Sequence, residues 1–327
     1  MLLSFQVQDI ISVPFGYVMD IFYRITQNYG LATILFAACV CLLMHPLNLK
    51  NAVSSYKRNR LEPHVQAIRA MYPKDVPMQN RMMERMYEKE NVSLSGGCLL
   101  ALIPFFILIP LFCVVYSPIR YMLHEGSGTA QALFQHIYEL KPELFEGCGG
   151  YWELATTKYI PQFADTIREK FPELREATLN GLNFNFLGID LSSVPQLNVA
   201  KWDANNWANI GLFLMPILAV LAQMGPSIYA GIKSLIKILK SKKGDNIAQN
   251  MKFNFLLPVM AILLLVIGYQ TPAALSLYWI TKSLIALLLN IHIQKKVAAV
   301  PPISISLEDL ANECTVHEDT GTTEFAE

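Results

Sequence analysis

The sequence predicts an all-α, polytopic membrane protein of five spanning helices, whose apolar segments are interrupted by polar residues. Of its 327 residues, 53% are hydrophobic and only 16% are charged, and the mean hydropathy is +0.33. Soluble domains carry roughly 25% charged residues. The apolar residues also gather in five blocks, each near the ~20 residues that cross the hydrocarbon core of a bilayer. Both the composition and its clustering therefore favour a membrane protein over a soluble one.

The five blocks predict the spans in chain order: residues 30–49, 96–118, 206–230, 253–270 and 272–293. The last two follow each other so closely that we expect them to form a tight antiparallel pair. Pro104, Pro110, Pro216 and Pro258 lie inside the blocks. Spanning helices tolerate prolines because neighbouring helices and side chains satisfy the freed carbonyl groups.

The segment before the first span, residues 1–29, has a different pattern. From Pro14 onward, Phe15, Val18 and Phe22 repeat at helical spacing, while Asp20 and Arg24 occupy another face. This helix is too short and too polar to span. We therefore expect it to lie outside the cytoplasm, in the plane of the membrane interface.

Charge in the connecting loops predicts the orientation. Residues 50–95 hold nine Lys and Arg, residues 231–252 hold six Lys, and residues 121–205 hold eleven acidic against six basic side chains. Short basic loops stay in the cytoplasm, whereas long segments translocate whatever their charge. The N-terminus is therefore predicted outside, the acidic segment 119–205 outside, and the C-terminal tail 294–327 inside. The formal net charge is zero, which gives no case for DNA as a partner.

The first basic loop, residues 50–95, predicts a cytoplasmic helical hairpin with arms at 50–71 and 78–90. Its second arm is rich in methionine, including Met82, Met83 and Met86. Methionine is soft and adapts to varied apolar partners, so this surface is a candidate contact for clients. The alternative is that these side chains pack between the two arms. In the outer segment we expect several helices between Thr129 and Asn180, and we expect disorder in the acidic tail after Val300.

No cofactor or metal site is predicted. The six cysteines form no CxxC pair and no zinc-ligand spacing with histidine. Most lie in or beside apolar blocks, where cysteine behaves as a small hydrophobic residue. We also expect neither a removable signal peptide nor a transit peptide.

Four stretches of the sequence resemble the YidC/Oxa/Alb-type membrane protein insertase family. They are NYGLATILFAACVCLLMHPLNLK at 28–50, LEPHVQAIRAMYP at 61–73 followed by MYEKENVSLSGGC at 86–98, FLGIDLSSVP at 186–195 and PAALSLYWIT at 272–281. Each stretch alone is modest, but all four occur in order and with matching topology. The resemblance covers nearly the whole chain outside residues 125–180 and the tail.

The resemblance implies a bacterial plasma-membrane insertase and chaperone rather than an enzyme. Its five helices would enclose a hydrophilic groove that is open to the cytoplasm and to lipid but closed outside. Nascent membrane proteins would pass their polar segments through this groove without a nucleotide. The Sec translocon and the ribosome are the further partners that the family suggests.

One departure from the family concerns the groove's positive charge. An arginine in the first core span commonly supplies that charge, but alignment on Pro46 places Cys41 at its position. Lys282 carries an unexpected charge in the last span. At 1.5 Å per residue, both residues lie roughly 15 Å from the outer ends of their helices. We hypothesise that the charge has moved to Lys282; the alternative is a lysine held by a neighbouring carbonyl or reaching toward the interface.

Other polar or aromatic residues are weaker groove candidates. Gln223 and Asn290 could face the groove or make hydrogen bonds between helices. Tyr278 and Trp279 match the family's aromatic pair, and either could instead pack between helices.

Two other classes of protein are alternatives to the insertase. A polytopic small-molecule transporter is the main alternative, although the chain shows no internal repeat of the kind that transporters often carry. An intramembrane enzyme would need a nucleophile with a base at membrane depth, and Cys41 has no His or acidic partner within the spans.

Overall fold

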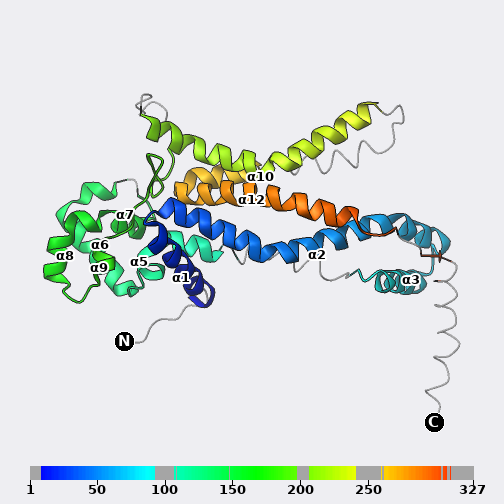
Figure 1. Ribbon diagram of the computed structural model, residues 1–327, viewed down its shortest axis with the longest axis horizontal. Coiled ribbons are helices and arrows are strands. Elements are labelled where there is room, and N and C mark those ends of the chain that lie inside the picture. The colour runs from blue at the N-terminus through cyan, green and yellow to red at the C-terminus, as the bar shows by residue number, and fades with distance from the viewer. Residues whose placement is uncertain are drawn as a thin grey trace, which may run out of the picture. The chain divides into compact units, whose positions relative to one another are not determined.

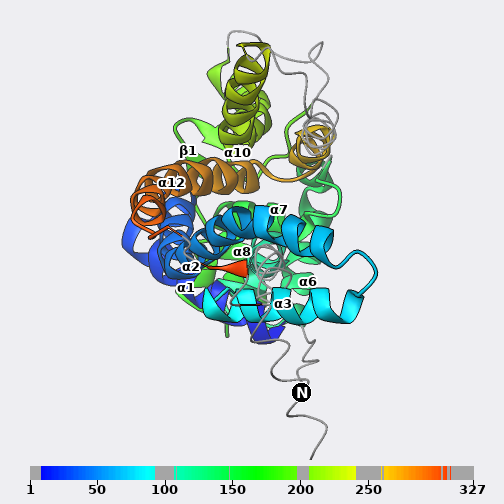
Figure 2. The ribbon, with the colours of Figure 1, turned by 90° about the vertical axis from the view of Figure 1, so that its right-hand side faces the viewer.

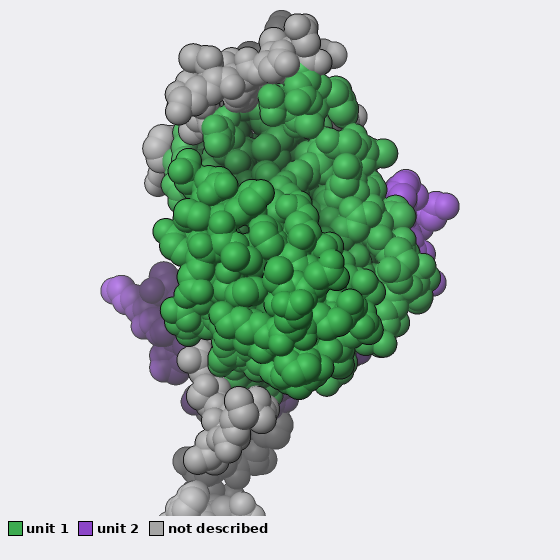
Figure 3. All heavy atoms as spheres, turned by 90° about the vertical axis from the view of Figure 1, so that its left-hand side faces the viewer, with its two compact units in different colours: residues 1–41, 105–287 green, residues 42–104, 288–327 purple. Residues whose placement is uncertain are grey.

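The computed structural model of the chain describes residues 9–92, 107, 109–146, 148–196, 206–240, 259, 261–302, 305–307 and 310. Almost all of the secondary structure described is helical, with one two-stranded β-hairpin, which confirms the predicted all-α class. The chain forms two compact units, Met1–Cys41 with Phe105–Leu287 and Leu42–Pro104 with Leu288–Glu327 (Figure 3).

Three of the described helices contain a stretch long and apolar enough to cross a membrane (Figure 1): α2 (Tyr29–Met71), α10 (Trp207–Lys240, with its apolar part at Trp207–Gly225) and α12 (Ala273–Ala298). They coincide with the predicted first, third and fifth spans. The predicted second and fourth spans lie largely outside the described residues. Their described parts, 109–116 and Ala261–Gln270, are helical, and the count of five remains a prediction.

Helix α2 differs from its prediction because it does not end at the predicted boundary near Lys50. Its 43 residues run through both Pro46 and Pro63, so the first span and the first arm of the hairpin are one helix. Each proline removes a single backbone hydrogen bond. The two prolines lie far enough apart for the intervening turns, rich in helix-forming side chains, to keep the helix continuous.

The second arm of the hairpin is α3 (Val76–Lys89), which lies beside the distal half of α2 (Figure 2). Asp75 caps α3, since its carboxylate accepts a hydrogen bond of 2.9 Å from the Met78 amide. The arms enclose an apolar cluster made of Leu61, Val65, Ile68, Met78, Met82, Met86, Val92 and Leu310.

Leu310 in this cluster is an ordered point in a tail for which we expected disorder, and residues 311–327 lie outside the described residues. Its side chain is fully buried, and Ile305 and Leu307 pack against the same cluster. The Leu310 amide donates to the Ser306 carbonyl oxygen at 3.3 Å, which closes one helical turn. The acidic composition of the tail hid these three apolar residues, which recur at a spacing of two to three.

The N-terminal helix α1 (Asp9–Thr26) presents its faces differently from the prediction. Asp9 and Asp20 are buried against the protein, whereas Ile10, Tyr17, Ile21 and Ile25 are exposed. Asp9 accepts hydrogen bonds from Arg120 (2.7 Å) and Tyr121 (2.8 Å), and Asp20 contacts His124 at 3.1 Å. These polar contacts dock α1 against α5 (Pro118–Tyr121) and leave an apolar strip facing outward.

The segment after α5 is a cluster of short helices, as expected (Figure 1). It contains α6 (Ser127–Leu140), η1 (Pro142–Phe145), α7 (Trp152–Tyr159), η2 (Ile160–Phe163), α8 (Ala164–Lys170) and α9 (Glu176–Leu179). A β-hairpin follows, in which β1 (Asn185–Phe186) pairs with β2 (Ile189–Asp190) antiparallel, Asn185 opposite Asp190. Leu187 and Gly188 form its two-residue turn with φ of 53° and 82°, the left-handed conformation that such turns require.

Candidate functional site

The segment around the β-hairpin, residues 183–193, contacts the N-terminal ends of three helices. We call it the outer clamp, because the predicted orientation places these ends outside the cytoplasm. The Tyr29 amide at the start of α2 donates to the Asn183 carbonyl oxygen at 2.9 Å. At the start of α12, the Ala273 amide donates to the Ser193 carbonyl oxygen at 3.0 Å. At the start of α10, the Trp207 indole donates to the Leu187 carbonyl oxygen at 3.2 Å. This outer clamp sets the register of the helices that carry the predicted groove residues.

Asp190 organises the outer clamp. Its carboxylate accepts hydrogen bonds from the Ser192 hydroxyl (2.6 Å), the Ser193 hydroxyl (2.9 Å) and the Lys158 ammonium (2.7 Å). Burial opposes ionisation of this carboxyl, but the hydrogen bonds from Lys158 and the two serines outweigh it and hold the Asp190 pKa below its ordinary value. Burial likewise opposes the Lys158 charge, yet the hydrogen bond and charge of Asp190 raise the Lys158 pKa. Sequence reasoning singled out this stretch only through the family resemblance.

Below the outer clamp, α2 and α12 meet at Cys41 and Lys282. The Cys41 sulfur lies 3.7 Å from the Lys282 carbonyl oxygen, to which the thiol donates a weak hydrogen bond. Cys41 is buried, and Lys282 is half-buried. The position that aligns with the family's arginine is therefore in contact with the backbone of the residue that carries the charge in this chain.

The next residue on α12 links that helix to α10. The Ser283 hydroxyl lies 2.7 Å from the Gln223 Oε1 atom, to which it donates a hydrogen bond. Polar groups of α2, α10 and α12 thus gather within two successive residues of α12. Ser283 was not among the predicted site residues, because its role depends on how α10 and α12 cross.

Within the part of the chain that the structure describes, no carboxylate forms an ion pair with the Lys282 ammonium. A charged group in hydrocarbon without a partner is costly, so this ammonium requires water or a polar partner. One turn nearer the outer end, Tyr278 is buried and its ring centroid lies 6.4 Å from that of Phe36 on α2. Trp279 beside it is half-buried.

Asn290 is exposed and belongs to the second compact unit. In that same unit, His45 Nε2 on α2 and His292 Nδ1 on α12 lie 2.8 Å apart in an exposed hydrogen bond. This pair joins α2 to α12 within the unit.

Two of the three methionines predicted to contact clients face the interior of the hairpin. Met82 and Met86 are fully buried between the arms, and Met83 packs against the same cluster while remaining partly exposed. In this arrangement Met82 and Met86 offer no surface to a client, which is the packing expected under the alternative interpretation. Met83 is the one of the three with accessible surface.

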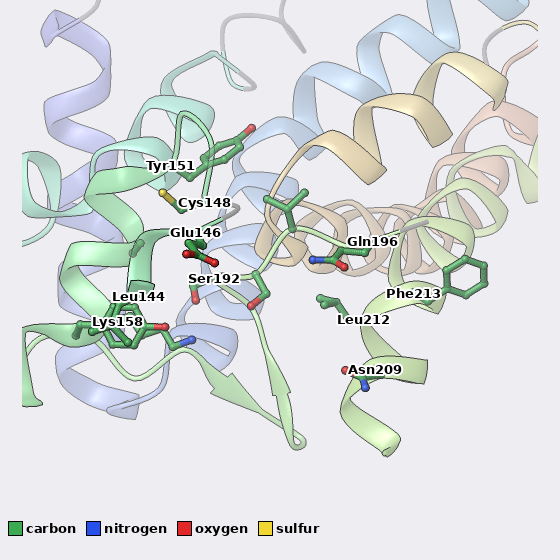
Figure 4. Close-up of a pocket in the computed structure, with 14 residues that line it drawn as sticks. Leu144, Glu146, Cys148, Tyr151, Lys158, Ser192, Gln196, Asn209, Leu212 and Phe213 are labelled. Atoms are coloured by element: carbon green, nitrogen blue, oxygen red, sulfur yellow. The ribbon is translucent and has the colours of Figure 1, made fainter. Parts of the chain in front are cut away.

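A cavity of about 340 Å³ lies beside the outer clamp rather than at the predicted groove residues. Glu146, Cys148, Tyr151, Lys158 and Ser192 line one wall, and Gln196, Asn209, Leu212 and Phe213 line the other (Figure 4). None of the residues predicted for the groove lines this cavity. Among the described residues, no group of three or more His, Cys, Asp or Glu side chains is arranged to hold a metal ion.

Long apolar helices linked to one another by hydrogen bonds of polar groups define this chain as a multi-pass membrane protein. The chain belongs to the family described as 60Kd inner membrane protein, whose family model matches residues 21–299.

Curated relatives carry the name Membrane protein insertase YidC. The chain is 35% identical over 106 residues to the protein from Syntrophobacter fumaroxidans, covering 32% of this chain and 18% of the relative. It is 35% identical over 107 residues to the protein from Bradyrhizobium diazoefficiens, covering 33% and 17%. A longer match, 25% identical over 217 residues, is with the protein from Granulibacter bethesdensis and covers 62% and 37%. The matched part thus spans well under half of these relatives' own length.

Proposed function

We propose that this chain is a membrane protein insertase and chaperone that passes polar segments of nascent membrane proteins through a hydrophilic groove in the membrane. The observation that carries the proposal is the meeting of Cys41 with Lys282, one residue from the bond between Ser283 and Gln223. Polar groups from three apolar helices converge there at mid-length. Membership of the family and the printed name of its relatives support the same function.

The physical basis is the cost of moving charge through hydrocarbon. A charged side chain at the bilayer centre costs about 2.5–3.5 kcal/mol on insertion scales. A watered groove that reaches mid-membrane shortens the apolar path that a client's polar segment must cross. Burial of the client's apolar segment, at roughly 25 cal/mol per Å², can then drive the transfer without a nucleotide.

In this proposal Lys282 supplies the positive charge that an arginine commonly supplies in the family. An ammonium in the groove attracts the acidic groups of a client and keeps water in place around them. Tyr278 and Trp279 lie on the outer side of Lys282 along α12, and Gln223 reaches the next residue, so all three fit the wall of such a groove. The contact between Cys41 and the Lys282 backbone supports this move of the positive charge from the first span to the last. It brings the two positions that could carry the charge side by side.

The remaining assignments are proposals of the same kind. The chain resides in a bacterial plasma membrane with its N-terminus outside and its C-terminus in the cytoplasm, as the basic loops indicate. The exposed strip of Ile10, Tyr17, Ile21 and Ile25 on α1 is the kind of face that a helix buries in a membrane interface. Clients emerge from the ribosome, and the Sec translocon is a further partner.

The experiment is rescue of a cell depleted of its own insertase. We expect the wild-type chain and Lys282→Arg to restore growth and client insertion, and Lys282→Met to lose most of the activity for clients with charged outer segments. Cys41→Arg introduced together with Lys282→Met should restore it, because the charge returns to the same level of the groove. Leu284→Met, an exposed position two residues along α12, is the matched control. Full activity of Lys282→Met, or failure of the wild-type chain to rescue, contradicts the proposal.

A further inference from the structure

The cytoplasmic hairpin holds a short piece of the chain's own tail in its apolar interior. Leu310 is fully buried among residues of both arms, and Ile305 and Leu307 pack against the same cluster. We call Ile305, Leu307 and Leu310 the tail plug, and we call the surrounding residues the hairpin socket, which consists of Leu61, Val65, Ile68, Met78, Met82, Met86 and Val92.

The hairpin socket suits exchange of occupants. Three of these seven residues are methionines, whose flexible, polarisable side chains repack around apolar partners of different shape. Leucine and valine sockets fix one partner more tightly, since their rotamers are fewer. Met83 packs beside the socket and keeps accessible surface, so an incoming segment has a point of first contact.

Among the described residues of the tail plug, three apolar side chains pack against the hairpin socket, and the Leu310 amide donates a backbone hydrogen bond of 3.3 Å to the Ser306 carbonyl oxygen. A short helical segment is marginal by itself. The short distance along the chain offsets this weakness. Helix α12 ends at Ala298, and a tether of a few residues between it and the tail plug gives an effective concentration of about millimolar.

Charge adds a second, non-specific attraction. Residues 301–327 carry seven Asp and Glu and no Lys or Arg, whereas residues 50–95 of the hairpin loop hold nine Lys and Arg. Opposite charges draw the tail toward the hairpin, and salt weakens that attraction when the charges are exposed.

We infer that the hairpin socket is a binding site for a short apolar helical segment of a client, and that the tail plug occupies this site until a client displaces it. The inference rests on the proposed function, because it names what the hairpin does in an insertase. A spanning segment offers many more apolar side chains than the three of the plug. Once a client is delivered close by, it therefore outcompetes the tethered tail.

Photocrosslinking from position 83 in the full-length chain, in native membranes, tests the inference. With a photoreactive residue in place of Met83, we expect crosslinks to the tail without client, and crosslinks to a ribosome-bound, single-span nascent chain when it is added. Leu310→Asp should reduce tail crosslinks by about tenfold, because it buries an unpaired charge, and should raise client crosslinks several-fold. Pro302→Asp, which adds the same charge at an exposed position of the same segment, should match the wild type.

A second measurement does not depend on how the variant folds. A synthetic peptide of residues 301–315, added to the otherwise wild-type chain, should reduce client crosslinks, and the same peptide with Leu310→Asp should not. Client crosslinks that respond to neither Leu310→Asp nor the peptide overturn the inference, as do tail crosslinks that persist at saturating client. If the chain rescues insertase-depleted cells but the expected changes in crosslinking are not seen, the inference about the tail plug is wrong and the proposed function stands. If rescue is not seen but the client still replaces the tail in the crosslinks, the proposed insertase function is wrong and the binding site stands.

Discussion

At the scale of single residues, the proposed site centres on Lys282. The Lys282 backbone accepts the Cys41 thiol at 3.7 Å, while its ammonium has no ion-pair partner among the described residues. Counting residues along two helices predicted that Cys41 and Lys282 lie at similar depth, since a helix rises a fixed distance per residue. The bond from Ser283 to Gln223 could not be predicted in this way, because helix crossing decides which side chains meet.

Asp190 supports a prediction about pH at the same scale. Its pKa is lower in the folded protein than its ordinary value, so its contribution to stability is present above about pH 4, the unfolded pKa, and is lost as the pH falls through the lower folded value. The Lys158 pKa is raised in the folded protein. The contribution of the Lys158 ammonium to stability is therefore complete below about pH 10, its unfolded pKa, and is lost as the pH rises through the higher folded pKa. The contribution of the pair is therefore steady between these limits.

We expect Asp190→Asn to reduce the free energy of unfolding by about 2 kcal/mol at neutral pH, the scale of a hydrogen bond to a charged group. Thermal unfolding of the detergent-solubilised chain across pH 3–9 measures this effect. The loss in Tm should be constant from pH 5 to pH 9 and should shrink toward pH 3. Asp165→Asn, whose carboxylate is fully exposed, is the control and should leave Tm unchanged. An equal loss in Tm at pH 3 and pH 7 for Asp190→Asn contradicts the assigned pKa.

At the scale of elements, the sequence predicted which helices exist better than where they end. The apolar blocks located α2, α10 and α12, because a run of about 20 apolar residues has few other uses. The patterns did not show that the predicted first span and the first arm of the hairpin form one continuous helix, since two prolines and a change to polar residues resemble a helix end. They also missed the tail plug, because three apolar residues in an acidic segment carry no periodic signal on their own. Those residues are buried only through tertiary contact with the socket formed by α2 and α3.

The outer clamp yields a prediction at the element scale. A methyl group on Gly30 of α2 would lie 2.5 Å from the Phe186 ring of β1, which is too close for any real contact. Gly30→Ala must push the β-hairpin away from α2, and overpacking of this kind typically costs about 1–3 kcal/mol. The expected results are a lower Tm and faster proteolysis of the segment around residues 183–193.

Gly225→Ala is the matched control for this substitution, because a methyl group there meets no atom within 4 Å. Alanine is favoured over glycine within a helix by up to about 1 kcal/mol, so this variant should be as stable as the wild type or slightly more stable. If Gly30→Ala and Gly225→Ala shift Tm alike, the clamp does not hold α2 in the way described.

At the scale of the whole molecule, three regions have distinct roles in the proposed function. The outer clamp joins the N-terminal ends of three helices, polar groups link α2, α10 and α12, and the hairpin buries Leu310 of the tail in its own compact unit. Composition predicted a multi-pass membrane protein, and the family match agrees. The lining of the proposed groove could not be predicted from sequence, since it depends on which faces of the helices point toward one another.

The central claim is that Lys282 lies in water at mid-membrane, and thiol chemistry at this position tests it most directly. In a chain whose native cysteines are replaced, Lys282→Cys should react with water-soluble 2-aminoethyl methanethiosulfonate about tenfold faster than Leu284→Cys, because the reactive thiolate forms in water and not in hydrocarbon. The product carries an ammonium near the original position, so insertion of charged clients should recover, whereas neutral methyl methanethiosulfonate should not restore it. Equal labelling of the two positions, or equal recovery with the neutral reagent, would contradict the account.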